Sequence, residues 1–488
     1  MHDKVSIRKL PSGVPGFDEV LGGGIPEFSL NLIVGGPGTG KTTLGHQIMI
    51  ANATPERKAL FFTVMGEPPL KMLRYMQQFS FFDASKLEES IRFFHLGKEA
   101  QEGGMGLVLE RIVTEVDASN PAIVVVDSFR DVMRRALPTP TLEMQLQDFM
   151  QLLAIHLTSG EATTFLLGEY AEDEHDSAVF TVADGIVRLL QSVERNSVVR
   201  KLQVQKMRGQ AQIPGLQTMR LTDDGVRVFP RILKPEEGSG VVRPFVDRLT
   251  TGVPVLDEMM GGGVPRGYSV LVAGPSGSGK TVLSNEFILE GIRRGEPGVI
   301  AVFEKRPNDY LQTTPHGDVF DGLLREKKLE IVYVRPLDLS IDETLVALRE
   351  AIVRTGAKRA VIDSLSGLEL ALAPTFRQDF RESLYRMVGA LTGMGVTVMS
   401  TVELPDSFTL LQFSPHGIAF LSDAIIMQRY LEIAGQLRRV ISVVKVRGSQ
   451  HSKDLREYEI QENGALVVGE TLVAYDGLLT GTPVRSKE

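Results

Sequence analysis

The sequence predicts an α/β protein built from two copies of one domain, each a mostly parallel twisted sheet flanked by helices. Two observations support this prediction: motifs recur at a constant spacing, and short apolar strands alternate with helical patterns in both halves. Alternating strands and helices imply right-handed crossovers and therefore parallel strands. The apolar runs are nearly continuous, which is typical of strands covered on both faces.

Three motifs recur at one offset of 239 residues. The segment SGVPGFDEVLGGGIP at 12–26 matches TGVPVLDEMMGGGVP at 251–265, and a glycine-rich loop and a late Lys-x-Arg-Gly keep the same spacing. A constant offset indicates a duplicated domain of about 240 residues, which is larger than a solenoid repeat. We expect a first domain at 1–235, an exposed linker at 236–240, a second domain at 241–470 and a short tail at 471–488.

Apolar runs bounded by glycine or aspartate give the expected strands. In the first half they lie at 32–34, 59–64, 123–126 and 163–167. In the second half they lie at 269–273, 299–303, 360–362 and 396–399. Each half therefore contains at least four buried strands separated by helical stretches.

The composition narrows the class of protein. The chain has 488 residues, 43% of them hydrophobic and 23% charged, and a net charge of −8, which does not favour binding to nucleic acid or an anionic membrane. Without any cysteine, disulfides, thiolate zinc sites and a cysteine nucleophile are excluded, and a reducing cytoplasm is the expected location. No run approaches the ~18 apolar residues of a membrane span, so we expect no membrane association.

Each half carries a loop of the pattern G-x-x-x-x-G-K-[ST], at 35–42 and at 274–281. Glycines in such a loop let successive backbone N–H groups surround phosphate oxygens, and the helix that follows favours anions at its N-terminus. Two matches at the repeat offset, each between an apolar run and a helical pattern, make a chance glycine-rich turn a poor explanation. The expected ATP-binding residues are Gly36, Gly38, Thr39, Gly40, Lys41, Thr42, Thr43, Ser276, Gly277, Ser278, Gly279, Lys280, Thr281 and Val282.

The end of each loop predicts the chemistry of a Mg-ATP site. Lys41 and Lys280 would reach the β- and γ-phosphates, and we expect both lysines to act in catalysis. Thr42 and Thr281 would ligate Mg²⁺. In each half an aspartate ends a buried apolar run downstream of the loop, where it can hold the Mg²⁺ hydration shell. The predicted metal residues are thus Thr42, Asp127, Thr281 and Asp363.

Together these segments resemble the RecA superfamily, and the duplication is similar to the KaiC family of clock ATPases and kinases. The resemblance runs from about residue 5 to about residue 468. It implies two tandem RecA-like P-loop domains, a homohexamer with ATP between neighbouring subunits, and a nucleotide-dependent signalling switch with a protein partner. It also assigns Lys206, Arg208, Lys445 and Arg447 to the γ-phosphate of the adjacent subunit's ATP, where a cation can neutralise charge during phosphoryl transfer.

The sequence departs from the family pattern after the second strand, where relatives carry two adjacent glutamates, one of them the base for water. The second repeat keeps Glu304 but has Lys305 in the next position, and the first repeat has Met65 and Gly66 there. Neither Met65 nor Gly66 can accept a proton. We therefore predict Glu304 as the catalytic base and the second domain as the more active ATPase. Other polarising carboxylates for the first domain would be Glu67 or Glu169.

Two alternative functions from other classes stay open. The first is a serine/threonine kinase that acts on itself or on another protein. The family's adjacent phosphoacceptor pair falls on Ala419 and Phe420, which lack hydroxyls, although Ser414 and Ser422 lie nearby. The second is a DNA-acting RecA-type motor, which the absence of tryptophan and of dense Lys/Arg runs disfavours.

Overall fold

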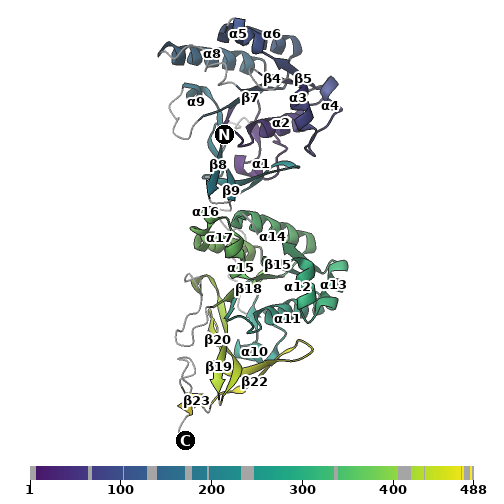
Figure 1. Cartoon of the computed structure of the whole chain (residues 1–488), viewed down its shortest axis with the longest axis vertical. Coiled ribbons are helices and arrows are strands. Elements are labelled where there is room, and N and C mark those ends of the chain that lie inside the picture. Colours follow the sequence, from purple (N-terminus) through teal and green to yellow (C-terminus); the bar gives the residue numbers. More distant parts are fainter. Residues whose placement is uncertain are drawn as a thin grey trace, which may run out of the picture. The chain divides into compact units, whose positions relative to one another are not determined.

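The structure is a computed structural model of the whole chain. It describes every residue except 1–6, 64–68, 103, 129–139, 171–177, 195–196, 232–246, 335–338, 405–418, 434, 474, 477–483 and 486–488. The chain forms two compact units, Met1–Arg231 and Ile232–Glu488, which are described separately (Figure 1). The linker predicted at 236–240 lies outside the described residues.

The first unit contains these helices and strands: β1 (Lys9–Leu10), α1 (Phe17–Leu21), β2 (Ile25–Pro26), β3 (Leu30–Gly35), α2 (Lys41–Asn52), β4 (Ala59–Thr63), α3 (Pro69–Met76), α4 (Lys86–Glu89), β5 (Ile91–His95), α5 (Gly97–Glu102), α6 (Gly104–Ser119), β6 (Ile123–Asp127), α8 (Pro140–Ser159), β7 (Thr163–Gly168), α9 (Ala178–Val182), β8 (Gly185–Glu194), β9 (Ser197–Met207), β10 (Gln217–Thr222) and β11 (Gly225–Phe229).

The second unit contains these: β12 (Arg248–Leu249), α10 (Pro254–Met259), β13 (Val264–Pro265), β14 (Ser269–Gly274), α11 (Lys280–Arg293), β15 (Gly298–Val302), α12 (Pro307–Thr313), α13 (Gly317–Arg325), β16 (Leu329–Tyr333), α14 (Ile341–Thr355), β17 (Arg359–Asp363), α15 (Leu365–Ala371), α16 (Pro374–Arg377), α17 (Phe380–Gly393), β18 (Thr397–Glu403), β19 (Ala424–Ile433), β20 (Gln436–Val446), β21 (Arg456–Ile460), β22 (Leu466–Thr471), β23 (Tyr475–Asp476) and β24 (Val484–Arg485).

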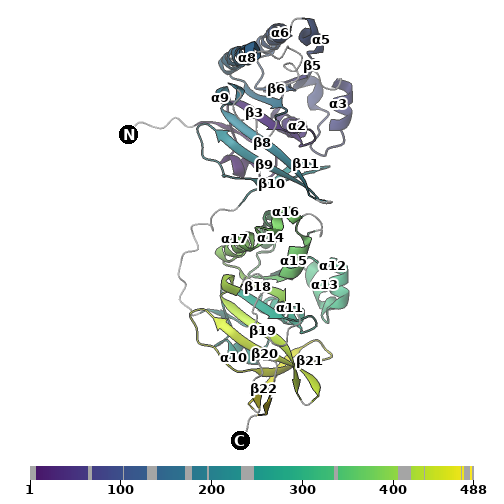
Figure 2. The same ribbon diagram turned by 60° about the vertical axis from the view of Figure 1, so that its left-hand side comes forward.

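Both units have a nine-stranded sheet with the same topology. The strand order is β5-β4-β6-β7-β3-β8-β9-β10-β11 in the first unit and β16-β15-β17-β18-β14-β19-β20-β21-β22 in the second. The six strands from β16 to β19 pair in parallel, and the last three add to them as antiparallel neighbours, which Figure 2 shows at one end of the sheet. The predicted tandem α/β fold is confirmed.

Each sheet buries both of its faces. In β14, Leu271 and Ala273 pack in one apolar cluster with α14, α15 and α17, whereas Val270 and Val272 pack in another with α10 and α11. Because successive strand residues point to opposite faces, only a strand covered on both sides can be apolar throughout. This packing fixes the strands' carboxyl ends, where the loops that carry the polar side chains begin.

Among the described residues, no helix combines the length and the apolar character that crossing a bilayer requires.

Candidate functional site

In the second unit, the phosphate loop joins β14 to α11 at the carboxyl edge of the parallel strands. Strand β14 ends at Gly274, and α11 begins at Lys280 with Gly279 as its N-cap at φ 95°. This left-handed conformation is one that glycine adopts without strain, so the chain can turn sharply from strand to helix. Lys280 Nζ donates to the carbonyl oxygens of Gly274 at 2.8 Å and Pro275 at 2.7 Å, which holds the ammonium over the loop.

A cavity of about 440 Å³ opens beside this loop, which is within the size range of small-molecule sites. Its walls come from the loop and α11, from the ends of β15, β17 and β18, and from α12 with the turn that follows it. It brings together these predicted residues: Ser276, Gly277, Gly279, Lys280, Thr281, Val282, Glu304 and Asp363. Predicted residue Ser278 is instead fully buried behind the loop, where its carbonyl oxygen accepts a hydrogen bond from the Tyr458 hydroxyl.

Asp363, which lines the cavity, accepts hydrogen bonds from two threonine hydroxyls. Thr281 Oγ1 donates to Asp363 Oδ2 at 2.8 Å, and Thr401 Oγ1 donates to Asp363 Oδ1 at 2.6 Å. The aspartate is the last residue of β17, so the sheet itself fixes its position. Hydroxyl and carboxylate oxygens are the ligands that Mg²⁺ prefers, and this pair fits such an ion next to bound phosphates.

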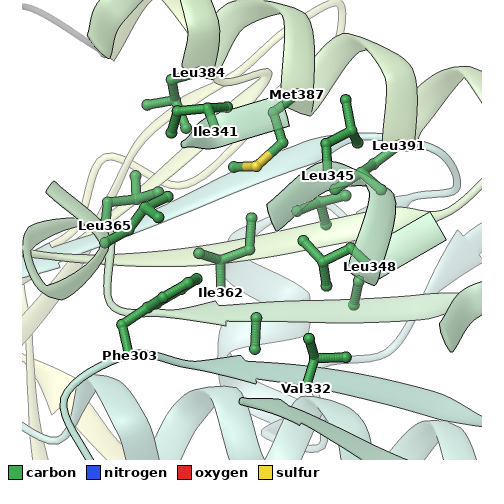
Figure 3. Packing of buried hydrophobic residues seen from close by; sticks show 14 of the residues in the cluster. Phe303, Val332, Ile341, Leu345, Leu348, Ile362, Leu365, Leu384, Met387 and Leu391 are labelled. Carbon is green, nitrogen blue, oxygen red and sulfur yellow. The ribbon is translucent and has the colours of Figure 1, made fainter. Parts of the chain in front are cut away.

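Glu304 lines the cavity from the end of the neighbouring strand. Its Oε1 accepts a hydrogen bond from Ser364 Oγ at 2.8 Å, and the same hydroxyl caps α15 by accepting from the Gly367 amide at 2.9 Å. Phe303, the preceding residue, is 1% exposed and points into the apolar cluster beside Leu365 (Figure 3). The buried phenylalanine and the serine hydrogen bond together hold the glutamate at the cavity wall.

Burial shifts the pKa of two charged groups in this site. It lowers the pKa of the Lys280 ammonium, although nearby carboxylates, led by that of Glu403, act in the opposite direction. It raises the pKa of the Asp363 carboxyl, against the hydrogen bonds from two threonine hydroxyls. Desolvation therefore disfavours both ionised forms, and each gains from an opposite charge. An anionic phosphate would supply that charge for the lysine, and a divalent cation would supply it for the aspartate.

The first unit repeats the loop and the hydroxyl–carboxylate pair. Lys41 Nζ donates to the carbonyl oxygens of Gly35 at 3.0 Å and Gly36 at 2.8 Å. Thr42 Oγ1 donates to Asp127 Oδ2 at 2.7 Å. In both units the peptide bond that follows the aspartate is cis. The two halves therefore present the same lysine, hydroxyl and carboxylate at the same strand ends.

The remaining predicted residues of the first loop lie beside these groups. Gly38 and Gly40 have positive φ angles of 73° and 101°, and Thr39 Oγ1 donates to the Gly36 carbonyl oxygen at 2.9 Å. Thr43 is half-buried in the first turn of α2. A carboxylate oxygen of Glu169 lies 4.0 Å from Lys41 Nζ, so one of the two proposed polarising carboxylates is near the phosphate lysine. Residues 65–67, which include the other, lie outside the described part of the chain.

Comparison with known proteins assigns the family. The model of the KaiC ATPase family matches residues 10–232 and again residues 249–472, so both phosphate loops lie in matched segments. The chain belongs to the KaiC ATPase family. The circadian clock oscillator protein KaiC of Picosynechococcus sp. is 26% identical over 98% of this chain and 93% of its own length. The protein of the same name from Prochlorococcus marinus is 26% identical over 99% of this chain and 96% of its own length. The circadian clock protein KaiC3 of Synechocystis sp. is 26% identical over 98% of this chain and 95% of its own length.

The basic pair of each KaiC repeat lies at the end of a long strand, with the lysine half-buried and the arginine exposed. Arg208 NH1 lies 3.1 Å from Asp184 Oδ1, and Arg447 NH1 lies 3.0 Å from Asp423 Oδ1. The arginine side chains are 60% and 63% exposed. The lysines of the two pairs donate to backbone carbonyl oxygens of their own units: Lys206 to Phe180 and Thr181, and Lys445 to Ala419. Neither Lys445 nor Arg447 is among the residues that line the second unit's cavity.

The candidate phosphoacceptors differ in what the structure describes. Ser422 is 8% exposed and lines a small separate cavity with Ser269 and Leu421, at the amino end of β14. Ser414 lies outside the described residues. The described serine is therefore a buried side chain within its own unit.

Sequence reasoning missed Glu403. The last residue of β18 pairs in register with Gly274 at the end of the loop strand and lines the cavity. In the first unit Val34 pairs with Gly168, which places Glu169 at the equivalent position directly after β7. Glu169 and Glu403 are 234 positions apart, so a search at the 239-residue offset does not align them. Only the strand register reveals that they are equivalent.

Proposed function

We propose that this KaiC-family chain binds Mg-ATP in both units, hydrolyses it mainly in the second, and works as a nucleotide-dependent switch. The observation that supports this most strongly is the second unit's cavity, which Lys280, Thr281, Asp363 and Glu304 all line. A phosphate lysine, a metal-binding pair and a carboxylate base are the parts that hydrolysis of a phosphoanhydride requires.

Each group has one role in this proposal. The loop amides and Lys280 bind the phosphates, and Thr281 and Asp363 would hold Mg²⁺. When bound, the ion neutralises charge on the phosphate oxygens. Glu304 accepts the proton of the attacking water, for which its ionised carboxylate must face the cavity. The hydrogen bond from Ser364 keeps that carboxylate in place before substrate arrives.

The two units differ at the residue that is proposed as the catalytic base. By the repeat offset, Met65 and Gly66 occupy the positions of Glu304 and Lys305, and neither can accept a proton. Ser128, which follows the strand-end aspartate as Ser364 does, has a buried hydroxyl without a hydrogen-bond partner among the described residues. This difference supports a first unit that retains ATP and a second unit that turns it over.

Inactivating one phosphate loop at a time tests which unit hydrolyses ATP. In the full-length chain, Lys280→Met should remove most steady-state phosphate release, whereas Lys41→Met should leave most of it. Loss of the loop lysine removes a charged phosphate contact from only one unit in each variant. Most of the turnover surviving in Lys280→Met would contradict the assignment of hydrolysis to the second unit.

We further propose that the chain forms a homohexamer and that Lys206, Arg208, Lys445 and Arg447 contact ATP of the adjacent subunit. The exposure of both arginines and the position of Arg447 outside the cavity of its own unit support this role. Size-exclusion chromatography with light scattering should show about six times the chain mass of 53.6 kDa in Mg-ATP and smaller species without it. A monomer under all conditions would contradict the role in trans. A cytoplasmic location and a protein signalling partner stay predictions.

A further inference from the structure

The cavity of the second unit contains a second lysine besides that of the phosphate loop. Lys305 follows Glu304, and its side chain lines the cavity together with Lys280 and Asp363. It is exposed, and it makes no ion pair with any described residue. The family comparison assigns no role to this side chain, and the predicted base is its neighbour Glu304.

Among the described residues, the hydrogen-bond partner of the Lys305 ammonium is a neutral hydroxyl. Its Nζ donates to Thr313 Oγ1 at 3.0 Å, and that hydroxyl donates in turn to the Asp309 carbonyl oxygen at 2.8 Å within α12. Both Lys305 and Thr313 line the cavity. A lysine side chain is a flexible stem with a compact charge, so exchanging a hydroxyl for a phosphate oxygen at the same wall costs little geometric change.

Carboxylates outnumber ammonium groups in the cavity, so a bound polyphosphate needs every cation that lines it. Three carboxylates line it, those of Glu304, Asp363 and Glu403, against two ammonium groups. The metal-binding carboxylate would be neutralised by its ion, and the other two would repel an incoming polyphosphate. A second cation at the α12 wall, Lys305, offsets this repulsion.

We infer that Lys305 is a second phosphate-binding cation of the second unit and contacts the terminal phosphate of ATP. The inference rests on the proposed ATP site and extends it to discrimination between nucleotides. Lys280 reaches the phosphates from the loop, and Lys305 reaches them from the α12 wall. Because ADP lacks the terminal phosphate, the contact distinguishes ATP from ADP. The first repeat has Gly66 at the corresponding position and lacks this contact.

The experiment uses the full-length chain with Lys41→Met, in which only the second unit keeps its phosphate lysine. Calorimetry measures the dissociation constants of Mg-ATP and Mg-ADP for this parent and for added Lys305→Met or Lys305→Arg. The matched control is Lys358→Met. Lys358 is also an exposed lysine, but it precedes the amino end of β17 and does not line the cavity.

We expect Lys305→Met to weaken ATP binding about ten- to a hundredfold and ADP binding less than about threefold, as the loss of one charged contact to the terminal phosphate requires. Lys305→Arg should retain most of the preference for ATP, and Lys358→Met should match the parent.

Equal weakening of ATP and ADP by Lys305→Met would show that the side chain supports the α12 wall only, and unchanged ATP affinity would show that it makes no phosphate contact. Either result would contradict the inference about Lys305 and would leave the proposed ATP site unaffected. Failure of the Lys41→Met parent to bind ATP overturns the proposed ATP site as well.

Discussion

Replacing Glu304 by glutamine tests the proposed base with little disturbance of the fold. Glutamine keeps an oxygen that can accept the hydrogen bond of Ser364 Oγ, which is 2.8 Å from Glu304 Oε1. The side chain is exposed at the cavity wall, so no buried charge is removed. We expect the free energy of unfolding to change by less than about 1 kcal/mol, as for most surface substitutions.

The loss of turnover should be much larger. A positioned general base contributes about 10²–10⁴-fold, which corresponds to at least ~2.7 kcal/mol of activation free energy. Because the first unit lacks a carboxylate at this position, it should add only a minor background of hydrolysis, which limits the loss that is measured for the whole chain. Steady-state phosphate release at saturating Mg-ATP should therefore fall by at least about tenfold overall, while ATP binding by calorimetry stays within about threefold.

Two further variants make the test specific. Glu330→Gln changes a partly exposed carboxylate on β16, paired with Arg354, which does not line the cavity, and should leave turnover unchanged. Glu403→Gln changes the other strand-end carboxylate of the cavity. If most hydrolysis survives Glu304→Gln and disappears in Glu403→Gln, the base has been assigned to the wrong strand.

Three other predictions follow from the packing of the second unit. Gly367→Ala should lower phosphate release without loss of ATP binding, because a Cβ there would lie 2.6 Å from Glu304 Cγ, whereas Gly322→Ala, with nothing within 4 Å, should have no effect. Arg359→Met should destabilise the unit by about 3 kcal/mol in chemical denaturation, because the side chain is fully buried and paired with a glutamate and two carbonyl oxygens; an unchanged midpoint would refute this. Burial raises the pKa of the Asp363 carboxyl in the folded state, so the folded state loses stability as pH rises through that pKa and the carboxyl ionises. In the absence of ligand, Asp363→Asn should therefore have a Tm equal to or above that of the parent near pH 8. The difference in Tm should shrink at acid pH, where the parent carboxyl is protonated. Mg-ATP should no longer raise the Tm of the second unit in this variant. A Tm below that of the parent at pH 8 would contradict the predicted direction of the effect.

The loops and the first strands could be predicted because their signals are local. A parallel strand buried on both faces is apolar along its whole length, and the phosphate loop needs glycines and a lysine at fixed spacing. The predicted strand at 269–273 corresponds to β14, which ends one residue later. The late antiparallel strands gave no such signal, because β20 mixes buried and exposed positions.

The carboxylates of the site needed the three-dimensional register. Glu403 is brought to the loop by parallel pairing of β18 with β14, between segments more than a hundred residues apart. Lys305 stood out in the sequence only as a departure from a glutamate pair. Its position in the cavity and its hydrogen bond to Thr313 became visible only once α12 was placed.

The number of ATP molecules bound per chain tests the central claim most directly. Equilibrium binding of Mg-ATP to the full-length protein should give two sites per chain, one site in Lys41→Met or Lys280→Met, and none in the double variant. Two sites retained after both lysines are replaced, or no nucleotide bound by the parent chain in the presence of magnesium, would contradict the account.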